Sequence, residues 1–381
     1  MIGLDAGRNG PSGLAKVVAL NWPLIVLLSA IAATGFLMLY SVAGGNIDRW
    51  AEPQMIRFAI GMVAMVIIGL VNIRFWRSMA PLAYLGALGL LVLVEVMGTV
   101  GMGAQRWIDL GFILLQPSEV MKIALVMALA WYYSLIGRDR VSRPLWVFLP
   151  IAITLIPVAL VLKQPDLGTA LLLLMGAGAV MFLAGVSIWY FVFAGAAAGG
   201  LITAVLKSQG TDWQLLKDYQ YRRIFTFLDP SVDPLGAGYH ITQAKIAMGS
   251  GGLSGRGFMQ GTQSRLNFLP EKHTDFIFTT LAEEFGFTGS AFLLGLYALV
   301  VVFCFVSAIS NRDRFGAILT AGVGVTFFLF FAVNMGMVMG MMPVVGVPLP
   351  LVSYGGSAML VLLAAFGLVQ SAHVHRPRGP D

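Results

Sequence analysis

The sequence predicts an all-α membrane protein with about ten transmembrane helices. Of its 381 residues, 58% are hydrophobic and only 11% are charged, and the mean hydropathy is +0.84. The apolar residues come in runs of roughly 17–25, the length of an α-helical span, whereas a β-barrel would show short alternating segments. The single cysteine, Cys304, excludes a disulfide framework and a cysteine metal site.

We expect one transmembrane domain over residues 1–381. Its spans are predicted at 23–42, 57–73, 79–99, 118–136, 145–162, 168–186, 187–206, 275–309, 315–341 and 350–372. The first is expected to be retained, because it lacks a small-residue cleavage signal. A long loop, about 207–274, separates the seventh and eighth spans. The eighth is too long for one bilayer, and Gly286 and Gly289 allow it to bend.

Positive charges predict the orientation of these spans. Short connections on one side carry Arg8, Lys16, Arg74, Arg77, Arg138, Arg140, Arg143, Arg312, Arg314, Arg376 and Arg378. Those on the other side carry only Arg49, Arg57, Arg106 and Lys163. Because cytoplasmic loops are the ones enriched in Lys and Arg, we expect cytoplasmic N- and C-termini and an extracytoplasmic long loop.

Four polar segments then fall on the outer side of the membrane. Two resemble each other, Gln116-Pro117-Ser118-Glu119 and Gln164-Pro165-Asp166, and each places a proline near a helix start with an acid after it. The others are the long loop and the turn 343–357, which is rich in proline and glycine. Irregular backbone at membrane depth persists only against protein or a wet cavity, so these segments predict a site.

Asp275 stands where the eighth span is expected to begin, with Thr274 in position to cap it. Asp275 could serve only the helix N-terminus or could serve chemistry, and we favour chemistry. Glu283 and Glu284 follow inside the same apolar helix. A charged group at mid-bilayer costs roughly 3 kcal/mol, so we expect a structural ion pair for at least one of these glutamates.

Glu119 and Lys122 lie three residues apart and so share one helix face. A self-satisfied ion pair is one interpretation. The other is that Glu119 holds Lys122 in place to meet an anion, with Arg106 of the preceding loop able to join them.

The glycine run 249–257 does not match a nucleotide-binding loop, because it lacks the Gly-Lys-Ser/Thr ending and no strand precedes it. The long loop is nevertheless basic, which suits a phosphorylated lipid head group. Its cations include Arg222, Arg223, Lys245, Arg256, Arg265 and Lys272. His273 and Asp275 form a His-x-Asp pair, which alone is a poor zinc signature, and we reject a zinc site.

Together these motifs resemble those of the SEDS family (shape, elongation, division and sporulation). They are Gln116-Pro117-Ser118-Glu119-x-x-Lys122, Gln164-Pro165-Asp166-Leu167-Gly168-Thr169, Phe268-Leu269-Pro270-Glu271-x-His273-Thr274-Asp275-Phe276-Ile277-Phe278 and Pro343-x-x-Gly346-Val347-Pro348-Leu349-Pro350-x-x-Ser353-Tyr354-Gly355-Gly356-Ser357. The resemblance covers nearly the whole chain in the same order, and it is greater to the elongation branch than to the division branch. Two departures, Leu351 and Ala358, touch no proposed chemical group.

The resemblance implies a peptidoglycan glycosyltransferase that polymerises lipid II on the outer face of the inner membrane, with a class B penicillin-binding protein as its transpeptidase partner and other elongation-complex membrane proteins. It implies a catalytic role for Asp275 and a polar cavity that contains Arg106, Glu119, Lys122 and Asp166. We further expect His273 and the loop cations Arg222, Arg223, Lys245, Arg256 and Lys272 to bind substrate. An Mg²⁺ or Mn²⁺ ion is the one cofactor that this chemistry leaves open.

Two other function classes compete with an enzyme. Intramembrane acids are as typical of transporters as of enzymes, so the chain could flip a lipid-linked precursor. The outer clustering of polar groups and the lack of a clear repeat argue against it. A pure scaffold of the elongation machinery would not need Asp275. We favour the enzyme.

Overall fold

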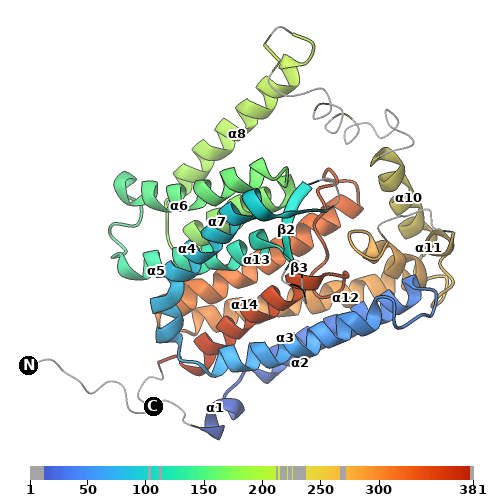
Figure 1. Ribbon diagram of the computed structural model, residues 1–381, viewed down its shortest axis with the longest axis horizontal. Coiled ribbons are helices and arrows are strands. Elements are labelled where there is room, and N and C mark those ends of the chain that lie inside the picture. The colour runs from blue at the N-terminus through green and yellow to red at the C-terminus, as the bar shows by residue number, and fades with distance from the viewer. Residues whose placement is uncertain are drawn as a thin grey trace, which may run out of the picture.

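The computed structural model describes residues 13–101, 104–109, 111, 114–211, 213–214, 221, 225, 237–266 and 272–377. Within these residues ten long helices form a bundle, in agreement with the ten expected spans (Figure 1). They are α2 (Trp22–Val42), α3 (Ala51–Leu70), α4 (Ile73–Met97), α5 (Pro117–Leu135), α6 (Pro144–Lys163), α7 (Leu167–Leu183), α8 (Ile188–Ser208), α12 (Ile277–Ile309), α13 (Arg314–Val338) and α14 (Gly356–Val374).

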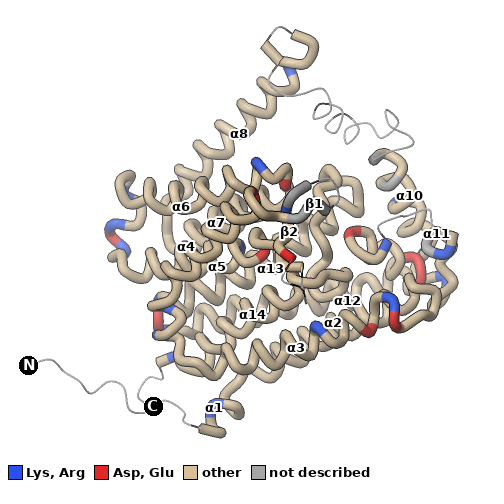
Figure 2. Tube along the Cα trace, viewed as in Figure 1, with Lys and Arg blue, Asp and Glu red and all other residues tan. Residues whose placement is uncertain are grey.

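Eight of the ten are long and apolar enough to cross a membrane by length and composition. The other two are α7, which has only 17 residues, and α5, which carries the buried Glu119 and Lys122. The protein is a multi-pass membrane protein. Figure 2 shows that charged residues lie mainly toward helix ends and in connections, as the cost of placing charge in the hydrocarbon layer requires.

Four helix starts differ from the expected ones. Helix α4 begins at Ile73 rather than at 79, so Arg74 and Arg77 lie inside the helix rather than in the connection before it. Helix α3 begins at Ala51 rather than at 57, so Arg57 lies inside the helix, where its guanidinium covers the ring of Tyr354 at 5.0 Å. Helix α14 begins at Gly356 rather than at 350, because residues before it form an irregular turn. Helix α12 begins at Ile277, two residues after Asp275.

The connections contain short elements that the sequence did not predict. A small antiparallel sheet of β1 (Thr99–Gly101), β2 (Ala104–Asp109) and β3 (Leu114–Leu115) lies between α4 and α5. The long connection after α8 includes α10 (Ala237–Ser250) and α11 (Thr262–Arg265). Before the first span lies the short α1 (Leu14–Val18), at the same end of the bundle as the end of α14 (Figure 1).

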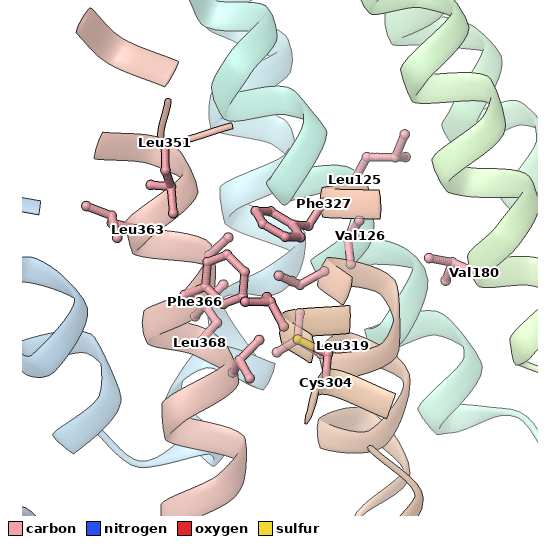
Figure 3. Packing of buried hydrophobic residues seen from close by; sticks show 14 of the residues in the cluster. Leu125, Val126, Val180, Cys304, Leu319, Phe327, Leu351, Leu363, Phe366 and Leu368 are labelled. Atoms are coloured by element: carbon pink, nitrogen blue, oxygen red, sulfur yellow. The ribbon is translucent and has the colours of Figure 1, made fainter. Parts of the chain in front are cut away.

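The core lies where α5, α7, α12, α13 and α14 meet. Figure 3 shows Phe327 of α13 and Phe366 of α14 close together, with the Cys304 side chain of α12 near Leu319. Small residues let these helices approach: a Cβ on Gly324 would lie 2.7 Å from the Cβ of Cys304. Close approach through small residues is the usual basis of helix association in a membrane, where the surrounding lipid is as apolar as the core.

Helix α8 is the exception to this packing. It extends away from the rest of the bundle (Figure 1), and no residue in its apolar stretch of 18 residues is buried.

Candidate active site

Asp275 lies in a turn just outside α12 and is partly exposed. The residue at the helix N-cap is Phe276, two residues after Thr274, so Thr274 does not occupy the N-cap position that the sequence predicted. Neighbouring elements hold the backbone of the turn. The Asn334 amide of α13 donates to the Asp275 carbonyl at 2.9 Å, and the Ser353 hydroxyl donates to the Thr274 carbonyl at 2.6 Å. The carboxylate is thus carried on fixed backbone.

The irregular turn 343–355 packs against the Asp275 turn. Its Tyr354 backbone N–H donates to the His273 carbonyl at 2.9 Å, and a Cβ built on Gly346 would lie 3.7 Å from Oδ2 of Asp275. Gly346 has φ +70°, a conformation that favours glycine. The backbone of the turn at Gly346 therefore approaches the Asp275 carboxylate with no side chain between them.

Three buried polar residues build this support. Sequence reasoning placed Ser353 in a site motif but did not identify Asn334 or Gln54. Asn334 bridges two segments, because its Nδ2 also donates to the Val347 carbonyl at 2.7 Å. Gln54 of α3 donates to the Ser353 carbonyl at 2.9 Å, and the Ser353 Oγ accepts from Leu349 N–H at 2.8 Å. A lone amide inside an apolar span was the available signal, since such a group must find a partner.

Glu119 and Lys122 form the ion pair that their spacing predicts. Lys122 Nζ lies 2.6 Å from Glu119 Oε1, and both side chains are buried at 4% and 9% exposure. The ammonium also lies 3.9 Å from the ring centroid of Phe330 on α13, a cation–π contact. Lys122 is therefore held in one orientation on the inner face of α5.

This pair borders a largely apolar cavity of about 50 Å³ between α5, α13 and α14. Ser353 also lines the cavity, and Ser353 is the residue that binds the Thr274 carbonyl. The cavity and the Asp275 turn thus share one wall, the segment Pro348–Ser353.

Removing the cation alone should destabilise the protein strongly. In a Lys122→Met variant, the Glu119 carboxylate would stay buried without its partner, which costs ~3–5 kcal/mol. Thermal unfolding in detergent should show a clear fall in midpoint. The double variant Glu119→Gln/Lys122→Met leaves no buried charge and should recover most of that loss; equal midpoints for the single and double variants would contradict this.

The two Gln-Pro-acid segments meet in the structure. The Gln116 amide donates to Asp166 Oδ2 at 3.3 Å, while Asp166 caps α7 by accepting from the Thr169 backbone at 3.1 Å and hydroxyl at 2.9 Å. Arg106 of β2 does not join Glu119 and Lys122. Its guanidinium instead donates to the carbonyls of Gln164, at 2.9 Å, and Pro165. Arg106 and Asp166 thus fix the start of α7.

The glycine run fits against a break in α12. Helical geometry fails at Gly286, with φ 63° and ψ −157°, so the expected bend occurs there. The backbone groups left without helical partners bond to the run: Arg256 and Gly257 N–H donate to the Glu283 and Glu284 carbonyls, both at 3.0 Å, and Phe287 and Thr288 N–H donate to the Gly252 and Leu253 carbonyls at 2.9 and 3.1 Å. A buried helix break requires such replacement bonds.

The two glutamates beside this break use hydrogen bonds rather than ion pairs. Glu283 Oε1 accepts from Thr262 N–H at 2.7 Å, the Thr262 hydroxyl at 2.9 Å and Gln263 N–H at 3.1 Å, at the start of α11. Glu284 Oε1 accepts from the Ser41 hydroxyl of α2. Neither pairs with a cation within the residues that the structure covers, so the expected ion pair is wrong. Backbone and hydroxyl donors from the long connection replace it at Glu283, and the Ser41 hydroxyl of α2 does so at Glu284.

The cations of the long connection do not all lie at one place in the structure. Arg256 donates to the Ser250 carbonyl at 3.4 Å and to Thr262 Oγ1 at 3.1 Å, and Lys245 packs on Gly340 at the end of α13, so both contact protein. Lys272 lines a polar pocket with Arg49 and Arg265. Arg222 and Arg223 lie outside the described residues.

His273 stacks on Trp50, with ring centroids 4.6 Å apart and planes at 7°. The guanidinium of Arg49 covers the same indole at 4.4 Å. This stack joins the start of α3 to the Asp275 turn. In the described part of the chain, no three His, Cys, Asp or Glu side chains group as metal ligands would.

Comparison with known proteins shows which family has this sequence and architecture. Residues 21–378 match the family model of the FtsW/RodA/SpoVE cell cycle proteins. The peptidoglycan glycosyltransferase MrdB of Escherichia coli strain K12 is 44% identical over 362 residues, covering 94% of this chain and 95% of that relative.

Two solved structures are similar over nearly the whole chain. One belongs to a study of how a peptidoglycan synthase complex coordinates polymerization and crosslinking, with TM-score 0.79, 34% identity and coverage of 93% of this chain and 98% of that one. The other is the rod shape determining protein RodA of Thermus thermophilus, with TM-score 0.71, 31% identity and coverage of 95% and 99%. This chain belongs to the FtsW/RodA/SpoVE family of cell cycle proteins.

Proposed function

We propose that this protein is a peptidoglycan glycosyltransferase that polymerises lipid II into β-1,4 glycan strands during cell elongation and releases undecaprenyl diphosphate. Relatives that carry the name peptidoglycan glycosyltransferase support the activity. The observation that carries the mechanism is the position of Asp275. It is a partly exposed carboxylate on a backbone turn fixed by Asn334 and Ser353, beside the wall of the cavity that holds Lys122.

The reaction needs one base and several cations. The donor is an α-linked sugar diphosphate and the product a β-link, so a single displacement inverts the anomeric carbon. In this proposal Asp275 takes the proton from the acceptor 4-hydroxyl as its oxygen bonds to C1. The bond from C1 to the diphosphate oxygen breaks, and diphosphate leaves without a general acid. Lys122 and Lys272 stabilise the charge that develops on it.

The surroundings of Lys122 suit a lipid-linked substrate. The ammonium lies at an apolar cavity lined by residues such as Val126, Phe330 and Leu362. A polyprenyl diphosphate has the same two parts, an anionic head and a hydrocarbon chain. Glu119 restrains the ammonium, so little side-chain freedom is lost when the anion binds. The proposal assigns no step to a metal ion held by protein side chains.

Transport is supported less well. Each acid inside the bundle has a local partner: Glu119 pairs with Lys122, Glu283 binds the start of α11 and Glu284 binds Ser41. A transporter needs polar groups that continue across the bilayer. These acids instead serve fixed contacts near the connections.

Orientation and partner complete the proposal. The cation asymmetry supports cytoplasmic termini and an Asp275 turn that faces outward, to the periplasm. A class B penicillin-binding protein is proposed as the transpeptidase partner, because a structurally similar chain comes from a complex that coordinates polymerization and crosslinking.

The activity can be tested with purified components. The protein, with and without its transpeptidase partner, is given labelled lipid II in detergent, and products are separated on a glycan-chain gel. Wild type should yield polymer, most strongly in the complex. Lysozyme should digest this product. Moenomycin inhibits the unrelated glycosyltransferase class, so polymer formed in its presence does not come from a contaminating enzyme of that class. A folded complex that yields no polymer, with or without Mg²⁺, would overturn the proposal.

A further inference from the structure

The N-terminal end of α3 carries three large side chains on one face of the helix. They are Trp50, Gln54 and Arg57, and their spacing of four and then three residues places them one above the other. Trp50 is the N-cap residue of the helix, and Arg57 lies in its second turn. This face is directed at the two turns that surround Asp275, as the contacts below show.

Trp50 and Arg57 are both unfavourable choices for the helix itself. An N-cap position favours Ser, Thr, Asp or Asn, whose side chains accept a backbone N–H, and the Trp50 side chain makes no such bond. Arg57 places a charge inside an apolar span, and its Nη1 is buried without a hydrogen-bond partner in the part of the chain that the structure describes. Residues that break local rules in this way are expected where function requires them.

Both side chains contact the segments around Asp275. The Trp50 indole stacks on the ring of His273 with centroids 4.6 Å apart, and the Arg57 guanidinium covers the ring of Tyr354 at 5.0 Å. The His273 and Tyr354 rings lie 6.2 Å apart, and the Tyr354 N–H donates to the His273 carbonyl at 2.9 Å. These four side chains form an aromatic column that runs from α3 across both turns and back to α3.

Gln54 holds the same two turns between the ends of this column. Its amide donates to the Ser353 carbonyl at 2.9 Å and its Oε1 accepts from the Gly355 N–H at 3.4 Å. The Ser353 hydroxyl in turn donates to the Thr274 carbonyl at 2.6 Å. Every contact from this face of α3 therefore ends on a residue close to Asp275 in the chain or on the turn packed against it.

The aromatic column is not what attaches α3 to the bundle. Helix α3 packs along α14 through close approaches at glycines. A Cβ on Gly69 would lie 2.8 Å from the Cβ of Gln370, and a Cβ on Gly367 would lie 2.8 Å from the Cβ of Ile68. These contacts are about three helical turns beyond Arg57. Truncation of Trp50 should therefore leave α3 in place and remove support from the Asp275 turn.

We propose that Trp50 and Arg57 are positioning residues that hold the Asp275 carboxylate at the acceptor hydroxyl. The inference rests on the proposed function, in which Asp275 is the base. A general base must lie within hydrogen-bond reach of the proton that it takes, and a displacement of about 1 Å can lower the rate about a hundredfold. Trp50 acts through His273 and Arg57 acts through Tyr354.

Steady-state kinetics of lipid II polymerisation by the full-length protein test this role. Trp50→Ala should lower kcat by about tenfold to a hundredfold and leave KM within about twofold, because the base is displaced while substrate binding is kept. Trp50→Phe retains a ring that can stack, and it should recover kcat to within about threefold of wild type. Arg57→Leu should lower kcat in the same direction. Ile56→Ala, at a side chain 54% exposed on another face of α3, should match wild type.

Hydrogen–deuterium exchange gives a readout that needs no turnover. The Tyr354 N–H, which is bonded to the His273 carbonyl, should exchange about tenfold faster in Trp50→Ala and at the wild-type rate in Ile56→Ala. Arg57→Leu carries the same two readouts should Trp50→Ala not purify as folded protein.

Three results would overturn the proposal. They are unchanged exchange at Tyr354 in Trp50→Ala, a raised KM with unchanged kcat, which would mean that the column binds substrate, and a loss of kcat that Trp50→Phe does not recover. A wild-type protein that forms no polymer would instead refute the proposed function, and the exchange rates would still show whether the column holds the turn.

Discussion

Asp275→Asn should reduce polymerisation of lipid II at least a hundredfold while the protein stays folded in the membrane. A positioned general base typically contributes 10²–10⁴-fold, and an amide cannot accept the proton of the acceptor hydroxyl. The fold should tolerate the change, because the contacts made by Asn334 and Ser353 involve backbone carbonyls of this turn, which the variant keeps. Product formed per minute on a glycan-chain gel is the measurement.

A matched variant shows whether the effect belongs to this position. Asp109→Asn changes an exposed carboxylate on the β2 strand, whose Oδ1 accepts from Gly111 N–H at 2.8 Å, a bond that Asn can also accept. It should keep activity within twofold of wild type. Size-exclusion profiles and binding to the transpeptidase should be the same for all three proteins. An Asp275→Asn protein that still polymerises lipid II at the wild-type rate would remove the base from this mechanism.

Hydropathy predicts the helices well because each span must reach across the same hydrocarbon thickness. All ten spans are present, and the bend in α12 falls at a predicted glycine. Helix starts near the site are less predictable. Pro350 lies before α14 rather than in it, because the Pro348–Ser353 segment is used as a wall of the cavity. The local sequence does not indicate that this segment packs as a cavity wall instead of continuing the helix.

Contacts between distant segments account for most of the rest. Glu119 and Lys122 could be paired from their spacing because both lie on one helix. The partner of Asn334 could not, because it depends on which turn packs against α13. The same holds for Glu283: its donors come from α11, twenty residues or so earlier, and replace the ion pair that the cost of burial had led us to expect. The requirement for a partner was predictable, but its identity was not.

The second prediction with a large expected effect concerns the glycine run 249–257. Gly255→Ala should lower the free energy of unfolding by ~3 kcal/mol or more. A Cβ at this residue would overlap the carbonyl of Glu284 and lie 2.6 Å from the Cα of Phe285. Its φ is +80°, a region that costs a residue with a Cβ about 1–2 kcal/mol. Moving the run away to relieve the overlap breaks backbone bonds at the α12 break, each worth about 1 kcal/mol.

Gly249→Ala is the matched control. It lies in the same run, within α10, and a Cβ there would meet nothing within 4 Å. Alanine should therefore be neutral or slightly stabilising in that helix. Thermal unfolding in detergent should show a large fall in midpoint for Gly255→Ala and none for Gly249→Ala. Equal midpoints would mean that the run does not pack into the break. A fall confined to Gly255→Ala would show that these glycines serve close backbone approach to α12 rather than phosphate binding, which explains why a glycine-rich segment here lacks a nucleotide-loop signature.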